Sequence, residues 1–164
     1  MTSAGVAGYL NSLPDDAARA ALARCCAARR WVDAMIAARP FGDDAELLAA
    51  AERCWWELEQ ADWLEAFARH PRIGERSGDP WAQREQAGVD GAGEKTRAAL
   101  ARGNRDYERR FGYVFLICAA GKSADEMLAA LESRVANAPG VELQIAADEQ
   151  AKITRLRLEN LVAS

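Results

Sequence analysis

The chain has 164 residues, of which 50% are hydrophobic and 28% are charged, and its formal net charge is −4 at pH 7. This balance is typical of a folded globular protein and excludes a disordered chain. A chain of this length has room for one compact core, so we expect a single domain over residues 1–164. The acidic balance argues against a nucleic-acid partner, because general nucleic-acid binders are strongly basic.

Targeting signals are not apparent in the sequence. No apolar run reaches the length of about 18 residues that a transmembrane helix needs. The N-terminal residues lack the basic start and the apolar stretch of a secretory signal, and the C-terminal residues are not a peroxisomal address. We therefore expect a cytoplasmic protein without a membrane partner.

Helical patterns dominate the chain. It contains 36 Ala residues against 15 Val, Ile and Thr residues together, a ratio that favours helices over a large sheet. Pro14 followed by acidic residues indicates one helix start, and Ser123 with Glu126 has the spacing of a capping box. In chain order, we expect helices over residues 14–26, 29–38, 43–58, 60–69, 81–87, 94–110, 123–136 and 141–162.

Three segments break this helical pattern. Residues 71–80 and 88–93 contain the Gly and Pro residues of a loop and a turn. Residues 111–118 are rich in aromatic and β-branched side chains and are short, so we expect them to be extended or irregular. The sequence thus predicts an all-α, single-domain bundle of about eight helices with an irregular segment near residues 111–119.

The cysteine spacing argues against a metal site. Cys25, Cys26, Cys54 and Cys118 form no Cys-x-x-Cys pair, and His70 is the only histidine. A structural zinc site needs four such ligands in close pairs. We therefore expect reduced thiols that behave as small apolar residues, and no metal.

His70 is the first candidate for chemistry. It follows an apolar helical face that includes Trp63 and Phe67, and it stands directly before Pro71, which ends the helix. The partial negative charge at a helix C-terminus favours a protonated imidazole and poises His70 as a general acid or base. A structural histidine is the alternative, which this residue taken alone favours.

Glu85 and Gln86 form the second candidate pair. Glu85 follows His70 by fifteen residues, so the loop between them would have to fold the chain back. A carboxylate near the imidazole would orient the ring and raise its pKa. The alternative is a solvated helix end.

Arg157 is the third candidate. Ile153, Arg157 and Leu161 share one face of the last expected helix, so a guanidinium stands where a hydrophobic residue is expected. A partly buried Arg needs an anion, and both a substrate carboxylate and an internal Glu or Asp stay open.

The block His70-Pro71-Arg72-Ile73-Gly74-Glu75 resembles the signature of the OHCU (2-oxo-4-hydroxy-4-carboxy-5-ureidoimidazoline) decarboxylases of urate degradation. The resemblance extends over about residues 13–161, because further blocks agree in order along the chain. These blocks are Cys25-Cys26, Trp31, Arg39-Pro40-Phe41, 62–67, Glu85-Gln86-Ala87-Gly88, Tyr107, Phe111-Gly112, 115–119, Gly121-Lys122, Lys152-Ile153 and Leu156-Arg157-Leu158.

The resemblance implies an all-helical lyase that converts the small-molecule ureidoimidazoline OHCU to (S)-allantoin without a cofactor, and it suggests a homodimer. It implies that His70 is the catalytic acid or base, that Glu85 is its partner and that Arg157 holds the anionic or carbonyl end of the substrate. Ala82 stands where the family often has Ser, so one substrate hydrogen bond is in doubt. The implied substrate-binding residues are Pro71, Gln86, Phe115, Ile117, Cys118 and Ala119, the last four through their backbone.

Two other functions stay open from the residues. One is a hydrolase acting on a related ureido or hydantoin ring, in which His70 and Glu85 would activate water. The other is a helical interaction module without catalysis, which would not be stabilised by a small ligand.

Overall fold

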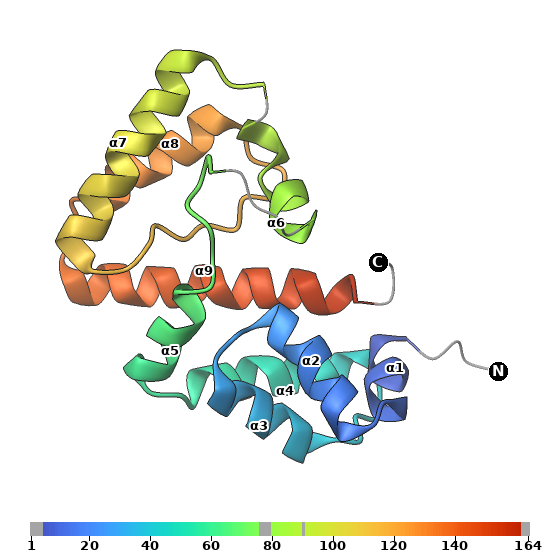
Figure 1. Cartoon of the computed structure of the whole chain (residues 1–164). Coiled ribbons are helices and arrows are strands. Elements are labelled where there is room, and N and C mark those ends of the chain that lie inside the picture. Colours follow the sequence, from blue (N-terminus) through green and yellow to red (C-terminus); the bar gives the residue numbers. More distant parts are fainter. Residues whose placement is uncertain (1–4, 76–79, 90, 162–164) are drawn as a thin grey trace. The chain divides into compact units, whose positions relative to one another are not determined.

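The computed structural model describes residues 5–75, 80–89 and 91–161 (Figure 1). Over these residues the chain forms nine α-helices and one 3₁₀ helix, and no strand occurs among them. The all-α prediction is therefore confirmed. The contacts divide the chain into two compact units, Met1–Ala66 with Ala151–Ser164 and Phe67–Gln150, and each is described by itself.

The first unit contains the N-terminal helices and the end of the C-terminal helix. Neighbouring helices pack in the order of the chain, α2 against α3 and α3 against α4, and α1 contacts both α2 and α4. The side chains of Leu10, Leu22, Trp31, Met35 and Leu47 are fully buried in its core. The helices are α1 (Val6–Ser12), α2 (Asp15–Cys25), α3 (Arg29–Ala38), α4 (Asp44–Trp56), α5 (Gln60–Phe67) and residues 151–159 of α9 (Pro139–Glu159).

Hydrogen bonds cap the start of α4 and hold the connection between α3 and α4. Asp43 caps α4, since its carboxylate accepts the Glu46 amide at 2.8 Å. The Asn11 side chain donates to the Phe41 carbonyl at 2.8 Å and accepts the Phe41 amide at 2.9 Å. One Arg39 nitrogen donates to the carbonyl of Leu10 at 2.8 Å. The α3–α4 connection is thereby tied to α1.

The second unit is built on a core that α7, α8 and the irregular segment share. Its elements are α6 (Pro80–Glu85), η1 (Ala87–Val89), α7 (Glu94–Phe111), α8 (Ala124–Arg134) and residues 139–150 of α9. A Cβ on Gly103 of α7 would come within 2.5 Å of Leu131 on α8, so glycine permits this close helix contact. The buried core residues are Ile73, Val89, Leu100, Tyr107, Phe115, Ile117, Ala119, Ala124, Met127 and Leu131.

Most predicted elements agree with the structure. Residues 29–38 are the predicted helix, Ser123 and Glu126 form both bonds of the predicted capping box, and residues 112–118 are irregular after Gly112, whose φ is 85°. The differences are that α1 was not predicted, that α5 ends at Phe67 instead of residue 69, that α9 spans Pro139–Glu159 instead of 141–162, and that residues 87–89 form a 3₁₀ turn. Parts of the predicted loop and turn lie outside the described residues (76–79 and 90).

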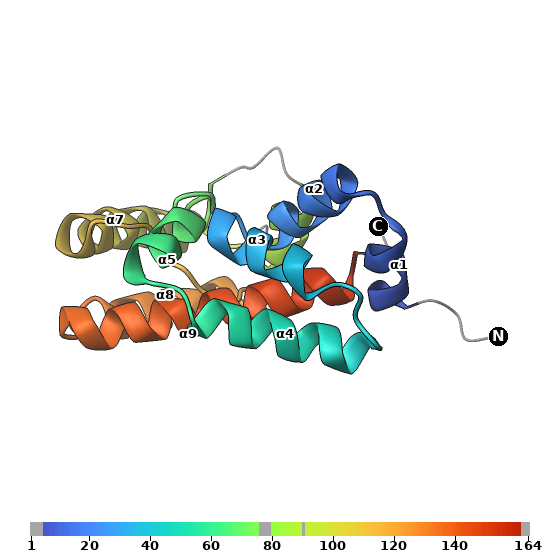
Figure 2. The same ribbon diagram turned by 90° about the horizontal axis from the view of Figure 1, so that it is seen from below.

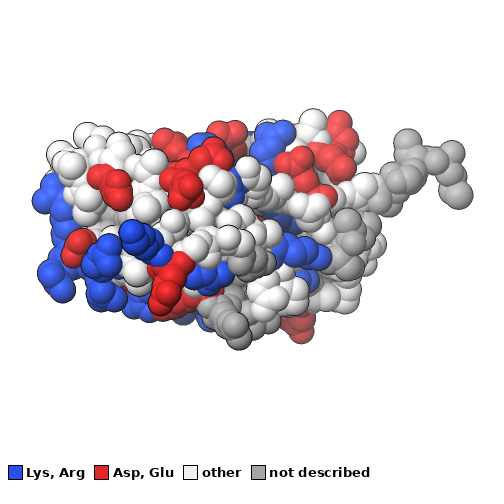
Figure 3. All heavy atoms as spheres, turned by 90° about the horizontal axis from the view of Figure 1, so that it is seen from above, with Lys and Arg blue, Asp and Glu red and all other residues white. Residues whose placement is uncertain are grey.

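Figure 2 shows the same helices from below. On the face in Figure 3, basic and acidic side chains are interspersed. Among the described residues, no helix has both the length and the apolar character to span a membrane.

Candidate functional site

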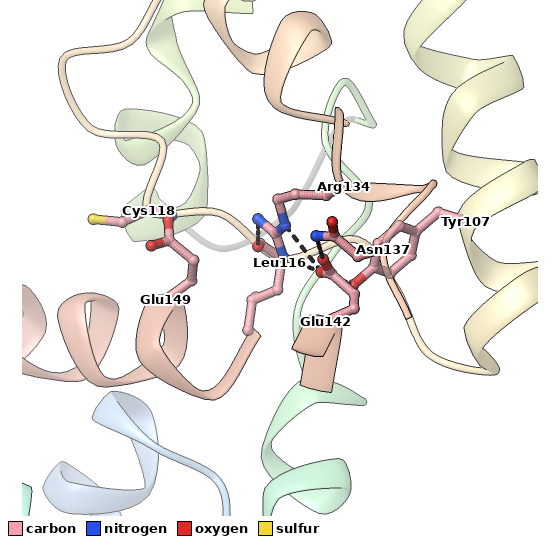
Figure 4. A network of polar contacts seen from close by, with 7 residues as sticks. All are labelled: Tyr107, Leu116, Cys118, Arg134, Asn137, Glu142 and Glu149. Carbon is pink, nitrogen blue, oxygen red and sulfur yellow. Dashed lines mark hydrogen bonds and ion pairs between the residues drawn. The ribbon is translucent and has the colours of Figure 1, made fainter. Parts of the chain in front are cut away.

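A buried ion pair stands at the centre of the second unit (Figure 4). The Arg134 guanidinium contacts one carboxylate oxygen of Glu142 through Nε at 2.9 Å and through Nη2 at 2.6 Å. The Tyr107 hydroxyl donates to the same oxygen, and the Asn137 amide donates to the other at 3.1 Å. Burial, followed by the Glu142 contact, raises the pKa of Tyr107 well above its ordinary value. The polar groups of this buried pair are thus paired with one another.

The ion pair holds the irregular segment in place. Arg134 Nη1 donates to the Leu116 carbonyl at 2.8 Å, and the guanidinium carbon lies 4.6 Å from the centre of the Phe115 ring. Residues 112–118 lie outside any helix or strand, so a buried side-chain donor is one way to fix their path. Arg134 therefore sets the position of the segment that leads to Cys118.

Glu149 of α9 fixes the next part of this segment. Its carboxylate accepts the Cys118 amide at 3.0 Å. Burial raises the pKa of the Cys118 thiol, Glu149 and Glu85 raise it further, and the Ala120 amide and Lys122 act in the opposite direction. Glu85 itself is the last residue of α6.

His70 is held by the residue next to Glu149. The imidazole Nε2 lies 2.6 Å from the side-chain carbonyl oxygen of Gln150, and the His70 amide donates to the Phe67 carbonyl at 3.1 Å. Gln150 is fully buried and His70 is half-buried. The predicted histidine thus stands just beyond the end of α5, with its ring tied to α9.

The segment after His70 is tied to α6 and α7. The Gly74 amide donates to the Gln86 side-chain oxygen at 2.9 Å, and the buried Asn104 side chain donates to the Ile73 carbonyl at 2.8 Å. Gly74 has a φ of 93°, a conformation that favours glycine. Pro71 at the start of this segment is half-buried.

Gly88 brings α6 and η1 against the end of the irregular segment. A Cβ at position 88 would lie 1.9 Å from the Lys122 carbonyl oxygen. The Lys122 amide in turn closes a turn onto the Ala119 carbonyl at 3.0 Å. Only glycine fits at this contact, which joins the end of the helix that carries Glu85 to the turn after Cys118.

The predicted site residues fall in both units. His70, Pro71, Glu85, Gln86 and residues 115–119 belong to the second unit. The side chains of Phe115, Ile117 and Ala119 are buried in its core, which leaves their backbone as the part that a ligand would contact. Arg157 belongs to the first unit, where its Nη1 donates to the Arg24 carbonyl at 3.1 Å.

Four residues that hold this arrangement were not predicted: Arg134, Glu142, Glu149 and Gln150. Glu142, Ala146 and Glu149 lie at i, i+4 and i+7 on one face of α9, and all are buried. Two acidic residues beside an alanine on one helical face are a signal that sequence reading had available. The described residues contain no group of three or more His, Cys, Asp or Glu side chains that would hold a metal ion.

Comparison with known proteins gives the class to which this fold and these residues belong. The model of the OHCU decarboxylase family matches residues 11–159. The chain is 33% identical to a solved OHCU decarboxylase whose crystal structure was obtained in the presence of (S)-allantoin, with a TM-score of 0.80, over 93% of this chain and 100% of that one. The chain therefore belongs to the OHCU decarboxylase family.

Two further proteins are similar to this chain. An Arabidopsis thaliana protein, the uric acid degradation bifunctional protein TTL, is 37% identical over 145 residues, which is 84% of this chain and 45% of the relative. The chain thus spans less than half of that bifunctional protein. A 2-oxo-4-hydroxy-4-carboxy-5-ureidoimidazoline decarboxylase of Haloferax volcanii is 28% identical over 159 residues, 94% of this chain and 95% of the relative.

Proposed function

We propose that this chain is a carboxy-lyase that decarboxylates OHCU to (S)-allantoin in urate degradation. The observation that carries the proposal is the arrangement in the second unit, where His70, Gln86 and Cys118 are each held by a hydrogen bond from a distant segment. The 33% identity to the OHCU decarboxylase solved with (S)-allantoin supports the choice of substrate.

The proposed reaction breaks one carbon–carbon bond and forms one carbon–hydrogen bond. The bond between the substrate carbon and its carboxylate breaks, CO₂ leaves, and the electron pair is delocalised into the neighbouring imine or carbonyl of the substrate. A proton then forms the new C–H bond on one face. Because the substrate itself accepts the electron pair, the protein has to orient the carboxylate, stabilise the developing charge and deliver the proton.

The residues divide these tasks in the proposal. His70 is the acid or base, and Glu85 is the carboxylate that acts with it. Arg157 binds the anionic or carbonyl end of the substrate. Gln86 and the backbone of residues 115–119 contact the polar ring and ureido groups, and Pro71 packs against the ligand. The Cys118 amide already donates to Glu149, so within this segment that amide is not offered to a ligand in this state.

The test is incubation with freshly generated OHCU and measurement of the product mass over time. Loss of CO₂ at a rate above that of the buffer supports the proposal, whereas addition of water would identify a hydrolase. His70→Ala is expected to lower the catalysed rate by about 10²- to 10⁴-fold, the usual contribution of general acid–base catalysis. A folded His70→Ala variant with the wild-type rate would remove His70 from the mechanism.

We further propose that residues 1–164 act as one family domain, that the protein forms a homodimer and that it works in the cytoplasm. The family match over residues 11–159, which includes parts of both units, supports the first of these. Light scattering after size-exclusion chromatography tests the dimer, and a mass of one chain would contradict it.

A further inference from the structure

Gln150 has a place in the second unit that the roles above do not use. Its side-chain oxygen lies 2.6 Å from His70 Nε2, a short distance for a hydrogen bond between a ring nitrogen and an oxygen. Gln150 is fully buried on α9, and its neighbour Glu149 holds the Cys118 amide at 3.0 Å. Adjacent residues on one helix therefore fix both the imidazole and the backbone at Cys118.

The chemistry of this contact fixes the protonation of the ring. A carbonyl oxygen only accepts a hydrogen bond, so the nitrogen facing it must carry a proton. In a neutral imidazole with a proton on Nε2, the lone pair is on Nδ1. The imidazolium also donates from Nε2, so the contact with Gln150 is compatible with the neutral Nε2–H ring and with the charged ring of this half-buried residue.

We infer that Gln150 is a positioning residue that accepts the Nε2 proton of His70, so that the proton exchanged with the substrate passes through Nδ1. This inference rests on the proposed decarboxylation. In that step the imidazolium gives its Nδ1 proton to the substrate carbon that has lost CO₂, and the neutral ring keeps its Nε2 proton on Gln150. CO₂ leaves with the bond that broke, and Nδ1 then takes one proton from solvent water, which restores the imidazolium for the next turnover.

The presence of a single histidine makes the test direct, because NMR of protein labelled with ¹⁵N-histidine shows one imidazole. The ligand-free wild type is expected to show an exchange-protected ring proton bound to Nε2. Gln150→Met has a similar volume and no comparable acceptor, so the protected proton should be lost. Gln144→Met, at an exposed position on the same helix, should keep the signal.

The second measurement is the steady-state kinetics of Gln150→Met. Gln150→Met is expected to lower kcat for OHCU by about 10-fold or more, within the range that acid–base catalysis contributes, while KM changes less than about twofold. A neutral wild-type ring that carries its proton on Nδ1 and none on Nε2 overturns the inference, even if the variant fails to fold. Survival of the Nε2 proton in folded Gln150→Met overturns it as well. The NMR spectrum needs no substrate, so a wild type that is inactive on OHCU would reject the proposed function and leave the hydrogen-bond assignment standing.

Discussion

At the scale of single residues, the buried pair of Arg134 and Glu142 constrains the second unit. The two side chains are 9% and 0% exposed, so each charge depends on the other for compensation. The pair also holds the Leu116 carbonyl, which connects its stability to the path of the irregular segment.

Removing one partner should therefore be far more costly than removing both. Glu142→Leu is expected to lower the free energy of unfolding by about 3–5 kcal/mol, because the Arg134 charge stays buried without its carboxylate. The double variant Arg134→Met, Glu142→Leu should recover most of this loss. Glu159→Gln breaks an exposed pair with Arg155 and should change stability by less than about 1 kcal/mol.

Urea unfolding of the four proteins measures these differences. Equal losses in the Glu142 single variant and in the double variant would show that packing at this position, and not the uncompensated charge, sets the cost.

Cys26 gives a prediction for alkaline pH. Burial raises the pKa of its thiol to about 12, against 9.0 for an ordinary thiol. Between these values the unfolded chain releases the proton and the folded chain keeps it, so the stabilising contribution is complete below pH 9 and is lost as the pH rises toward 12. The slope expected from this group is about 1.4 kcal/mol of lost stability per pH unit.

The measurement is the free energy of unfolding in urea with a reductant at several pH values from 8 to about 10.5. Cys26→Ala should show a shallower decline than the wild type over this range. Parallel declines in the two proteins would contradict the assignment to Cys26.

The sequence singled out His70 as a candidate but not the residues that hold it in the structure. His70 stood out because it is the only histidine and precedes Pro71. Gln150 and Glu149 did not stand out, since their partners are 80 and 31 residues away. Their acidic or amide side chains in a helix are equally compatible with a solvated face. The spacing of Glu142, Ala146 and Glu149 indicates a shared helical face but does not identify the partners of that face.

At the scale of elements, the contact between η1 and the turn at Lys122 joins two parts of the candidate site. Position 88 lies three residues after Glu85, and Lys122 lies four residues after Cys118. A side chain at position 88 would push these parts of the site away from each other.

Gly88→Ala should therefore reduce decarboxylation strongly and lower stability by about 1–3 kcal/mol, the usual cost of overpacking a tight contact. Gly93→Ala is the control, since a Cβ there meets nothing within 4 Å. Activity assays and thermal unfolding of both variants make the comparison. A Gly88→Ala protein with wild-type rate and melting temperature would exclude a role for this contact.

Elements with clear local sequence signals were predicted, and those without such signals were not. The helix at 29–38 and the capping box at Ser123 were predicted because periodicity and capping chemistry are local. Helix α1 has only seven residues, includes a glycine and has no side-chain cap, so its sequence carries none of these signals. Its position depends on tertiary contacts such as the Ala7 amide bond to Asp44 at 2.8 Å.

At the scale of the whole molecule, the sequence shows no linker, and the structure explains why. The two units meet in the chain inside helices α5 and α9, at Ala66 and Phe67 and at Gln150 and Ala151. A boundary inside a continuous helix leaves no Pro-, Gly- or Ser-rich composition to detect. Composition therefore predicted the fold class and could not predict this division.

Ligand binding should stabilise the whole chain if the proposed site exists. A ligand that binds the folded state adds about 2.7 kcal/mol of stability at one hundred times its Kd. (S)-Allantoin is thus expected to raise the melting temperature of the wild type in a concentration-dependent way. An unchanged melting temperature at millimolar (S)-allantoin would favour a non-catalytic helical module.

The most direct test of the proposed enzyme is the handedness of its product. Freshly generated OHCU is mixed with the wild type, and circular dichroism follows the allantoin that forms. The expected result is a rapid signal of the (S)-enantiomer, which His70→Ala does not produce. Racemic allantoin appearing with the wild type only as fast as in buffer would contradict the account.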